Sequence, residues 1–409
     1  MIEYKFVDGG MSVVQGMKSS GIHGGLKKQK KDFAIIYSEV EAVAAGVFTK
    51  NAVKAAPVLV TEEHLKVSNG FCRAIIVNSA NANACTGKLG FENAKEMTKI
   101  TAEELHIEPQ KVLVSSTGVV GVQLPMDIVS QGIKKACATV LTGNSSSDAA
   151  EAIMTTDTFP KEAAVEMEVG GKIVRIGGIA KGSGMIHPNM ATMLSFITTD
   201  VAISPGVLQE ALLEAVDETF NMISVDGDTS TNDMVLVLAN GLAGNKPITE
   251  KNADYDAFKK ALSALSFKLS ELVVRDGEGA TKFITVKVLN APSIEDARKA
   301  ARSVTTSSLV KTAIFGEDAN WGRVMVAVGY SGAVLNPNIV DMYIESNAGK
   351  EQMMKDGMGL AFSEENARKI LEQKDISLIV DLNMGVFEAT AWTCDFSYDY
   401  VKINADYRS

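Results

Sequence analysis

A threonine that follows a glycine- and proline-rich stretch has the clearest chemistry in this sequence. The stretch KGSGMIHPNMATMLSF runs from Lys181 to Phe196, and its second half leads into an apolar, strand-like segment. A threonine hydroxyl needs an adjacent base, and the α-amino group of an N-terminal threonine, with a reference pKa of roughly 7.7–8.0, can supply one. Thr192 gains that amine only if its bond to Ala191 is cut. We therefore consider self-cleavage at Ala191-Thr192, with a threonine that simply begins a strand as the alternative.

Other chemistries fit this stretch less well. A Walker A loop needs glycine, lysine and a hydroxyl residue in that order at the start of a helix, but Lys181 precedes its glycine and a strand follows. A dinucleotide-binding fingerprint also needs a helix after its glycines, which Pro188 opposes. We interpret His187 as a structural hydrogen-bonding residue, and no order of serine, histidine and aspartate suggests a catalytic triad.

Three further segments combine hydroxyl, carboxylate and glycine residues. SSTGVVG (115–121) follows an apolar strand and can expose backbone N–H groups to an oxyanion, although an ordinary turn is the simpler interpretation. TTDTFPK (155–161) fits a helix cap and a ligand contact equally well. RDGEGATK (275–282) places Glu278 between two glycines, which allow a backbone or a ligand to approach closely.

Two polar segments have a structural and a functional interpretation. NSANANACTG (78–87) is either a tight loop whose amides bond their own backbone or a loop that lines a pocket. DGDTSTND (226–233) suggests calcium, but an EF-hand loop needs glycine at its sixth position, where Thr231 stands. A polar turn before a strand fits this segment better. With the four histidines scattered as well, we expect no metal site and no cofactor.

The composition limits the class of protein. The chain has 409 residues, of which 46% are hydrophobic, so two or three lobes with substantial cores are expected. Its net charge of −10 and the absence of a clustered basic face argue against a nucleic-acid partner. No apolar run is long enough to predict a membrane span. The four cysteines form no paired motif, which favours reduced thiols in a cytoplasmic protein.

Periodic apolar residues predict a mixture of strands and helices. Buried strands are expected at 33–37, 74–77, 112–114, 234–238, 283–288 and 378–382. Helices are expected over 91–105 and 258–269, and after the capping residues Ser204, Ser293 and Ser363. The predicted fold class is therefore α/β (α+β).

The motifs together resemble one family, the ornithine acetyltransferases, which are the glutamate N-acetyltransferases of arginine biosynthesis. KGSGMIHPNMATML resembles the autoprocessing site of that family. The resemblance extends along nearly the whole chain, through the five segments above, GEDANWGRV and the terminal INADYRS. The departures are Ser79, Ala319 and the terminal Ser409, where glycine, proline and threonine are typical.

The resemblance implies a mechanism. Cleavage before Thr192 would give an α chain of residues 1–191 and a β chain from residue 192. Thr192 would attack the acetyl group of N-acetylornithine and pass it to glutamate, with Thr117 and Gly118 as the oxyanion hole. The substrate-binding residues implied by the family are Thr155, Lys181, Thr192, Glu278, Asn404 and Ser409. Acetyl-CoA remains open as a second acetyl donor.

The resemblance also implies an architecture. The expected fold is DmpA/ArgJ-like, with β-sheets between helical layers in a catalytic core (1–280) and a smaller C-terminal lobe (281–409) whose tail returns to the active site. Two α and two β chains would form a heterotetramer. A self-cleaving N-terminal-nucleophile aminopeptidase or amidohydrolase of the same fold is the alternative enzyme, and an uncleaved, non-enzymatic binding protein is a third interpretation.

Overall fold

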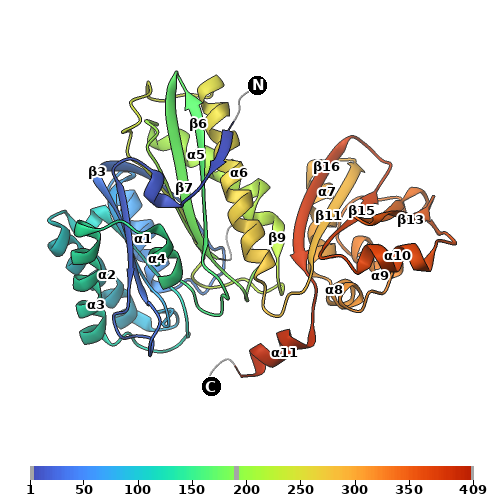
Figure 1. Ribbon diagram of the computed structural model, residues 1–409, viewed down its shortest axis with the longest axis horizontal. Helices are drawn as coiled ribbons and strands as arrows, with labels where there is room; N and C mark the ends of the chain where they lie inside the picture. Colours follow the sequence, from blue (N-terminus) through green and yellow to red (C-terminus); the bar gives the residue numbers. More distant parts are fainter. Residues whose placement is uncertain (1–3, 188–192, 407–409) are drawn as a thin grey trace. The chain divides into compact units, whose positions relative to one another are not determined.

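The computed structural model describes residues 4–187 and 193–406. These residues form two compact units, each with its own β-sheet (Figure 1). The first unit comprises Met1–Gly182, Pro188–Asn221 and Thr229–Val273. The second comprises Val274–Ser409 together with Ser183–His187 and Met222–Asp228. The last two segments are short stretches, flanked by residues of the first unit, that belong to the second unit. No local pattern in the sequence predicted this.

Within the described residues, nine strands form the mixed sheet of the first unit. Strands β8 and β10 are parallel, as are β4 and β5, whereas β10 and β3 are antiparallel. In spatial order the strands are β1 (Tyr4–Val7), β6 (Lys161–Val169), β7 (Lys172–Lys181), β8 (Leu194–Thr199), β10 (Met234–Ala239), β3 (Phe33–Phe48), β4 (Phe71–Asn78) and β5 (Val112–Ser116), with β2 (Met17–Ile22) paired to β3.

Alternate side chains of β3 enter two different cores, as expected for a strand that is buried on both faces. Phe33 and Ile35 belong to one apolar cluster, which includes side chains of α2 and α3. Ala34 and Ile36 belong to a second, which includes side chains of α4, β8 and β10. The helices of this part of the chain are α1 (Ala56–Val67), α2 (Gly87–Leu105), α3 (Met126–Thr142), α4 (Ser146–Ala152), α5 (Pro205–Glu218) and α6 (Ala253–Arg275).

The second unit has a sheet of seven strands among the described residues. In spatial order these are β14 (Met358–Gly359), β13 (Gly349–Lys355), β12 (Asp341–Ser346), β15 (Asp375–Asp381), β11 (Phe283–Ala291), β16 (Phe387–Cys394) and β9 (Ile223–Ser224). Its helices are α7 (Ile294–Thr306), α8 (Ser308–Phe315), α9 (Trp321–Gly329), α10 (Glu364–Leu371) and α11 (Tyr398–Ala405). One apolar cluster joins α7, α9 and α10 to the sheet.

Several local predictions from the sequence are confirmed. All six predicted strands coincide with observed strands, and α5 begins at Pro205 after Ser204. Ser293 and Ser363 cap α7 and α10 by accepting hydrogen bonds from the backbone N–H groups of Asp296 and Asn366. The mixed α/β class is confirmed. Among the helices of the described residues, none has the length and apolarity that crossing a bilayer requires.

Candidate active site

The loop after β5 is shaped to present hydrogen-bond donors. The Thr117 N–H donates to the Asn78 carbonyl at 3.0 Å, and the Val119 N–H donates to the Ala80 carbonyl at 3.1 Å. Gly118 lies between them with a φ of 131°, where an added Cβ would collide with the Ala80 backbone. Over residues 4–187 and 193–406, the Thr117 hydroxyl and the Gly118 N–H have no hydrogen-bond partner. These two donors are therefore available to an oxyanion.

An amide side chain ties this loop to the strands beside it. Asn232 Nδ2 donates to the Ser116 carbonyl at 2.8 Å and to the Ala82 carbonyl. Two residues later, the Met234 N–H that begins β10 donates to the Met193 carbonyl at 3.1 Å. The loop that carries Thr117 is thus fixed to β10, whose parallel partner β8 begins at Leu194, two positions after residue 192. Ala191 and Thr192 themselves lie outside the described residues.

Sequence reasoning missed the role of Asn232. We interpreted its segment, DGDTSTND, as a polar turn before a strand, and part of it is such a turn. The available signal was the position of an amide immediately before a buried strand, because a buried amide must find partners. The identity of those partners, more than 100 residues away in sequence, could not be read from that position.

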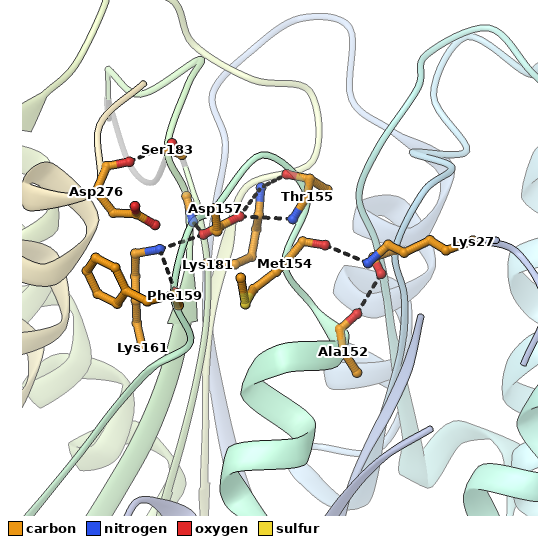
Figure 2. A network of polar contacts seen from close by, with 12 residues as sticks. Lys27, Ala152, Met154, Thr155, Asp157, Phe159, Lys161, Lys181, Ser183 and Asp276 are labelled. Atoms are coloured by element: carbon orange, nitrogen blue, oxygen red, sulfur yellow. Dashed lines mark hydrogen bonds and ion pairs between the residues drawn. The ribbon is translucent and has the colours of Figure 1, made fainter. Parts of the chain in front are cut away.

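Lys181 and Thr155 meet at the end of β7. Lys181 Nζ donates to Thr155 Oγ1 at 2.8 Å. Figure 2 shows the carboxylate of Asp157 between the ammonium groups of Lys181 and Lys161. Asp157 accepts hydrogen bonds from Lys161 Nζ at 2.7 Å, from the Gly182 N–H at 2.7 Å and from the Thr155 N–H at 2.9 Å. One buried carboxylate therefore fixes the backbone on both sides of the Lys181–Thr155 pair.

Burial and nearby charge determine the ionisation of this cluster. Burial acts to raise the pKa of Asp157, but the charges of Lys181 and Lys161 and the hydrogen bonds to the carboxylate hold it well below its usual range. Burial raises the pKa of Asp233 well above its ordinary value, against the opposing effects of Ser230 and Lys181. Asp157 is consequently the ionised carboxylate of this cluster.

Lys27 supports the same region from another side. Its ammonium group donates to the Met154 carbonyl at 2.7 Å and to the Lys31 carbonyl at 3.0 Å. Burial lowers the pKa of Lys27 to about 8, with Lys181 contributing and Asp32 opposing. Lys27 thereby holds the backbone immediately before Thr155.

In the second unit, Glu278 lies in a narrow turn. Its N–H donates to the Ser183 carbonyl at 3.0 Å, and its Oε2 accepts a hydrogen bond from Asn404 Nδ2 at 2.8 Å. An added Cβ on Gly184 would collide with the Glu278 carboxylate, so this glycine permits the close approach. Glu278 is 6% exposed, whereas Asn404 lies on α11, which buries none of its side chains. Ser409 lies outside the described residues.

His187 lies in a hydrogen-bonded environment, consistent with the structural role that we expected from the sequence. Its Nδ1 lies 3.3 Å from Ser224 Oγ, and its Nε2 lies 3.1 Å from an Arg302 guanidinium nitrogen. Burial, with Arg302 contributing, lowers the pKa of His187 to about 4. The neutral ring therefore accepts from Arg302 through Nε2.

The structure brings the expected site residues together in groups. Thr155 bonds directly to Lys181, and Glu278 bonds directly to Asn404. Thr117 and Gly118 are linked to the start of β8 and β10 through Asn232. A loop with two available donors beside a strand that follows a threonine is the arrangement expected of an α/β enzyme that transfers or hydrolyses acyl groups.

Comparison with known proteins agrees with this class. The model of the ArgJ family matches residues 18–409. The arginine biosynthesis bifunctional protein ArgJ of Symbiobacterium thermophilum is 54% identical over 408 residues, which cover 99% of this chain and 100% of the relative. That of Caldanaerobacter subterraneus is 52% identical over 405 residues, again covering 99% and 100%. The chain therefore belongs to the ArgJ family, acetyltransferases of arginine biosynthesis, and the family resemblance found in the sequence is confirmed.

A solved structure gives the same result for part of the chain. The crystal structure of the arginine biosynthesis bifunctional protein ArgJ from Bacillus halodurans is 47% identical, with a TM-score of 0.50. The match covers 52% of this chain and 99% of the solved chain.

Proposed function

We propose that this enzyme transfers the acetyl group of N2-acetylornithine to glutamate through an acetyl-threonine intermediate at Thr192. The precursor would first cleave itself between Ala191 and Thr192, which frees the α-amino group that serves as the base. The observation that carries the proposal is the loop of Thr117 and Gly118. Asn232 fixes this loop, with its two available donors, to β10, whose parallel partner β8 begins at Leu194.

The chemistry of each step follows from this arrangement. Thr192 Oγ attacks the acetyl carbonyl carbon while its proton passes to the Thr192 amine. The Thr117 hydroxyl and the Gly118 N–H donate to the resulting oxyanion, and removing one such donor costs about 2.7–4 kcal/mol of transition-state stabilisation. Collapse of the intermediate releases ornithine, whose amine takes the proton. The amine of glutamate then attacks the carbonyl carbon of the threonine ester. N-acetylglutamate is released and the Thr192 hydroxyl is restored, which completes a ping-pong cycle.

Complementary charges suit the two amino-acid substrates. The side chain of Lys181 is cationic and 10% exposed. We assign Lys181, together with Thr155, to the binding of a substrate carboxylate. We assign Glu278, held by Asn404, to a substrate ammonium group. Ser409 is placed at the substrate by the family resemblance alone.

The predicted processing and assembly belong to the same proposal. The solved Bacillus halodurans chain corresponds to 52% of this chain, a share that suits one fragment of a cleaved precursor. Two α and two β chains would form the working enzyme. Cys72, Cys85, Cys137 and Cys394 are all free, which supports function in the reducing cytoplasm.

One assay separates this function from its closest alternative. The enzyme is incubated with N-acetylornithine, with and without glutamate, and both acetate and N-acetylglutamate are measured. An acetyltransferase forms N-acetylglutamate only with glutamate and releases little acetate without it. Acetate release that does not depend on glutamate would instead indicate an amidohydrolase. A parallel incubation of acetyl-CoA with glutamate tests whether acetyl-CoA is a second donor.

A further inference from the structure

A buried lysine beside the proposed carboxylate-binding group has no role in the mechanism above. Lys161 begins β6, and its side chain is 0% exposed, as is that of Asp157. Burying an ammonium group is costly unless it is paired. Lys161 is paired, since its Nζ lies 2.7 Å from Asp157 Oδ1 and 4.9 Å from the centre of the Phe159 ring.

The two lysines at Asp157 are not equivalent. Lys161 makes a direct ion pair with Oδ1, whereas Lys181 Nζ is 4.0 Å from Oδ2 and hydrogen-bonds Thr155 instead. Lys161 is fully buried, and Lys181 retains 10% exposure. The lysine with access to a ligand is therefore the one that Asp157 holds more loosely.

The surroundings of Lys181 are basic. Lys161 and Lys27 both lie close to it around the ionised Asp157. Asp233, the other carboxyl group whose ionisation Lys181 affects, is buried and has a raised pKa. A substrate carboxylate at Lys181 would therefore be attracted by more than one cation.

We propose that Lys161 is a positioning residue: it occupies Asp157 so that the ammonium group of Lys181 stays available to the carboxylate of the substrate. Without Lys161, Asp157 would turn to Lys181 as its remaining cation and compete with the substrate. The inference rests on the proposed function, because it takes Lys181 to be the receptor for a substrate carboxylate.

The test uses binding of ornithine, which needs no chemical step. Lys161→Met, Asp157→Asn/Lys161→Met, Lys181→Met and wild type are prepared as full chains, checked for processing on a denaturing gel, and titrated with ornithine by calorimetry. Lys172→Met is the matched control, because Lys172 lies exposed at the start of β7. Glutamate KM and kcat are measured in parallel.

Lys161→Met is expected to weaken ornithine binding about 10-fold and to raise the glutamate KM more than it lowers kcat. The double variant is expected to recover binding to within about 3-fold of wild type, because no carboxylate then competes for Lys181. Lys172→Met should bind as wild type. A purely structural role for the pair predicts the opposite order, with the double variant at least as impaired as the single.

Two results would overturn the inference. One is unchanged binding in Lys161→Met, and the other is a double variant that binds as weakly as Lys161→Met or more weakly. If Lys161→Met does not fold, ornithine binding by the double variant is the remaining test. Weak binding by the double variant would then contradict the proposal. Lys181→Met separates this inference from the proposed function: unchanged ornithine binding in that variant would refute the role of Lys181 itself.

Discussion

Lys181 and Glu278, the two charged residues assigned to the substrate, are held in contrasting ways. Lys181 ends a strand of the first unit, beside a buried carboxylate that accepts hydrogen bonds from the N–H groups of Gly182 and Thr155. Glu278 lies in a turn of the second unit, where its backbone bonds Ser183 and its carboxylate bonds Asn404. Asn404 is exposed on α11, a helix with no buried side chain.

This contrast indicates which changes each group can tolerate. The position of Lys181 depends on buried charge, so substitutions in the core of the first unit should disturb it. The position of Glu278 depends on two chain segments, the stretch before the predicted cleavage site and the C-terminal helix. Changes in the exposed C-terminal helix should therefore reach the Glu278 group and leave the Lys181 group intact.

The largest effect is expected from Lys181→Met. Removing the cation leaves a substrate carboxylate unpaired, which costs about 2–5 kcal/mol when the pair is buried and hydrogen-bonded. Asp157 keeps Lys161, so the protein should still fold. Steady-state kinetics should show the loss mainly in KM. A variant with unchanged KM for both substrates would remove Lys181 from the binding site.

Deletion of residues 406–409 should have the next largest effect. The deletion removes Ser409, which we assign to the substrate, and leaves Asn404 in place, so activity should fall sharply, by about 10-fold or more, if a hydrogen bond to a charged group is lost. The thermal unfolding midpoint should change little, because α11 buries no side chain. Unchanged kinetics in the truncated enzyme would rule out the placement of the tail at the substrate.

Asn404→Ala tests the same group with a smaller change. It removes the hydrogen bond to Glu278 and leaves the helix in place. A hydrogen bond with one charged partner contributes about 1.5–3 kcal/mol. Because Asn404 is exposed, we expect the loss of binding free energy in this variant to be smaller than that. Val401→Ala, on the exposed surface of the same helix, is the matched control. Equal losses of activity in the two variants would show that the effect comes from the helix as a whole and not from the amide of Asn404.

The sequence predicted local structure better than the contacts at the site. The strand over 33–37 was recognised by its apolar residues, but β3 continues to Phe48 through the exposed Glu39–Glu41 segment and an irregularity in its pairing with β4. Because the residues at that irregularity are polar, the apolar pattern was interrupted and the second half of the strand was not predicted. The caps at Ser293 and Ser363 were predicted correctly because a cap depends on residues close in sequence.

Contacts at the site depend on distances along the chain that no local pattern encodes. The family resemblance supplied Thr155 and Lys181, which lie 26 residues apart and bond directly. The resemblance did not indicate a role for Asp157, although the segment TTDTFPK had been singled out. A sequence does not show whether a charged side chain is buried or exposed, and the role of Lys161 was missed for that reason as well.

The smallest effect concerns the segment before the predicted cleavage site. Burial and Arg302 lower the pKa of His187 from 6.5 to about 4. As the pH falls below about 6.5, the unfolded chain binds a proton before the folded protein does, so this group lowers stability progressively until about pH 4. His187→Gln should remove that contribution. Denaturant unfolding at about pH 7 and about pH 5 should show a smaller decrease for the variant than for wild type, and equal decreases would contradict the assignment.

The acetyl-threonine intermediate is the central claim, and its direct measurement is the mass of the β chain during turnover. The processed enzyme is mixed with N-acetylornithine in the absence of glutamate, quenched in acid and analysed by peptide mass spectrometry. We expect one acetyl group on Thr192, at the N-terminus of the β chain, which disappears when glutamate is added before the quench. Thr192→Ala should give one uncleaved chain without the acetyl group. An acetyl group on another residue, or full activity in an uncleaved chain, would contradict an acetyl-threonine intermediate at Thr192.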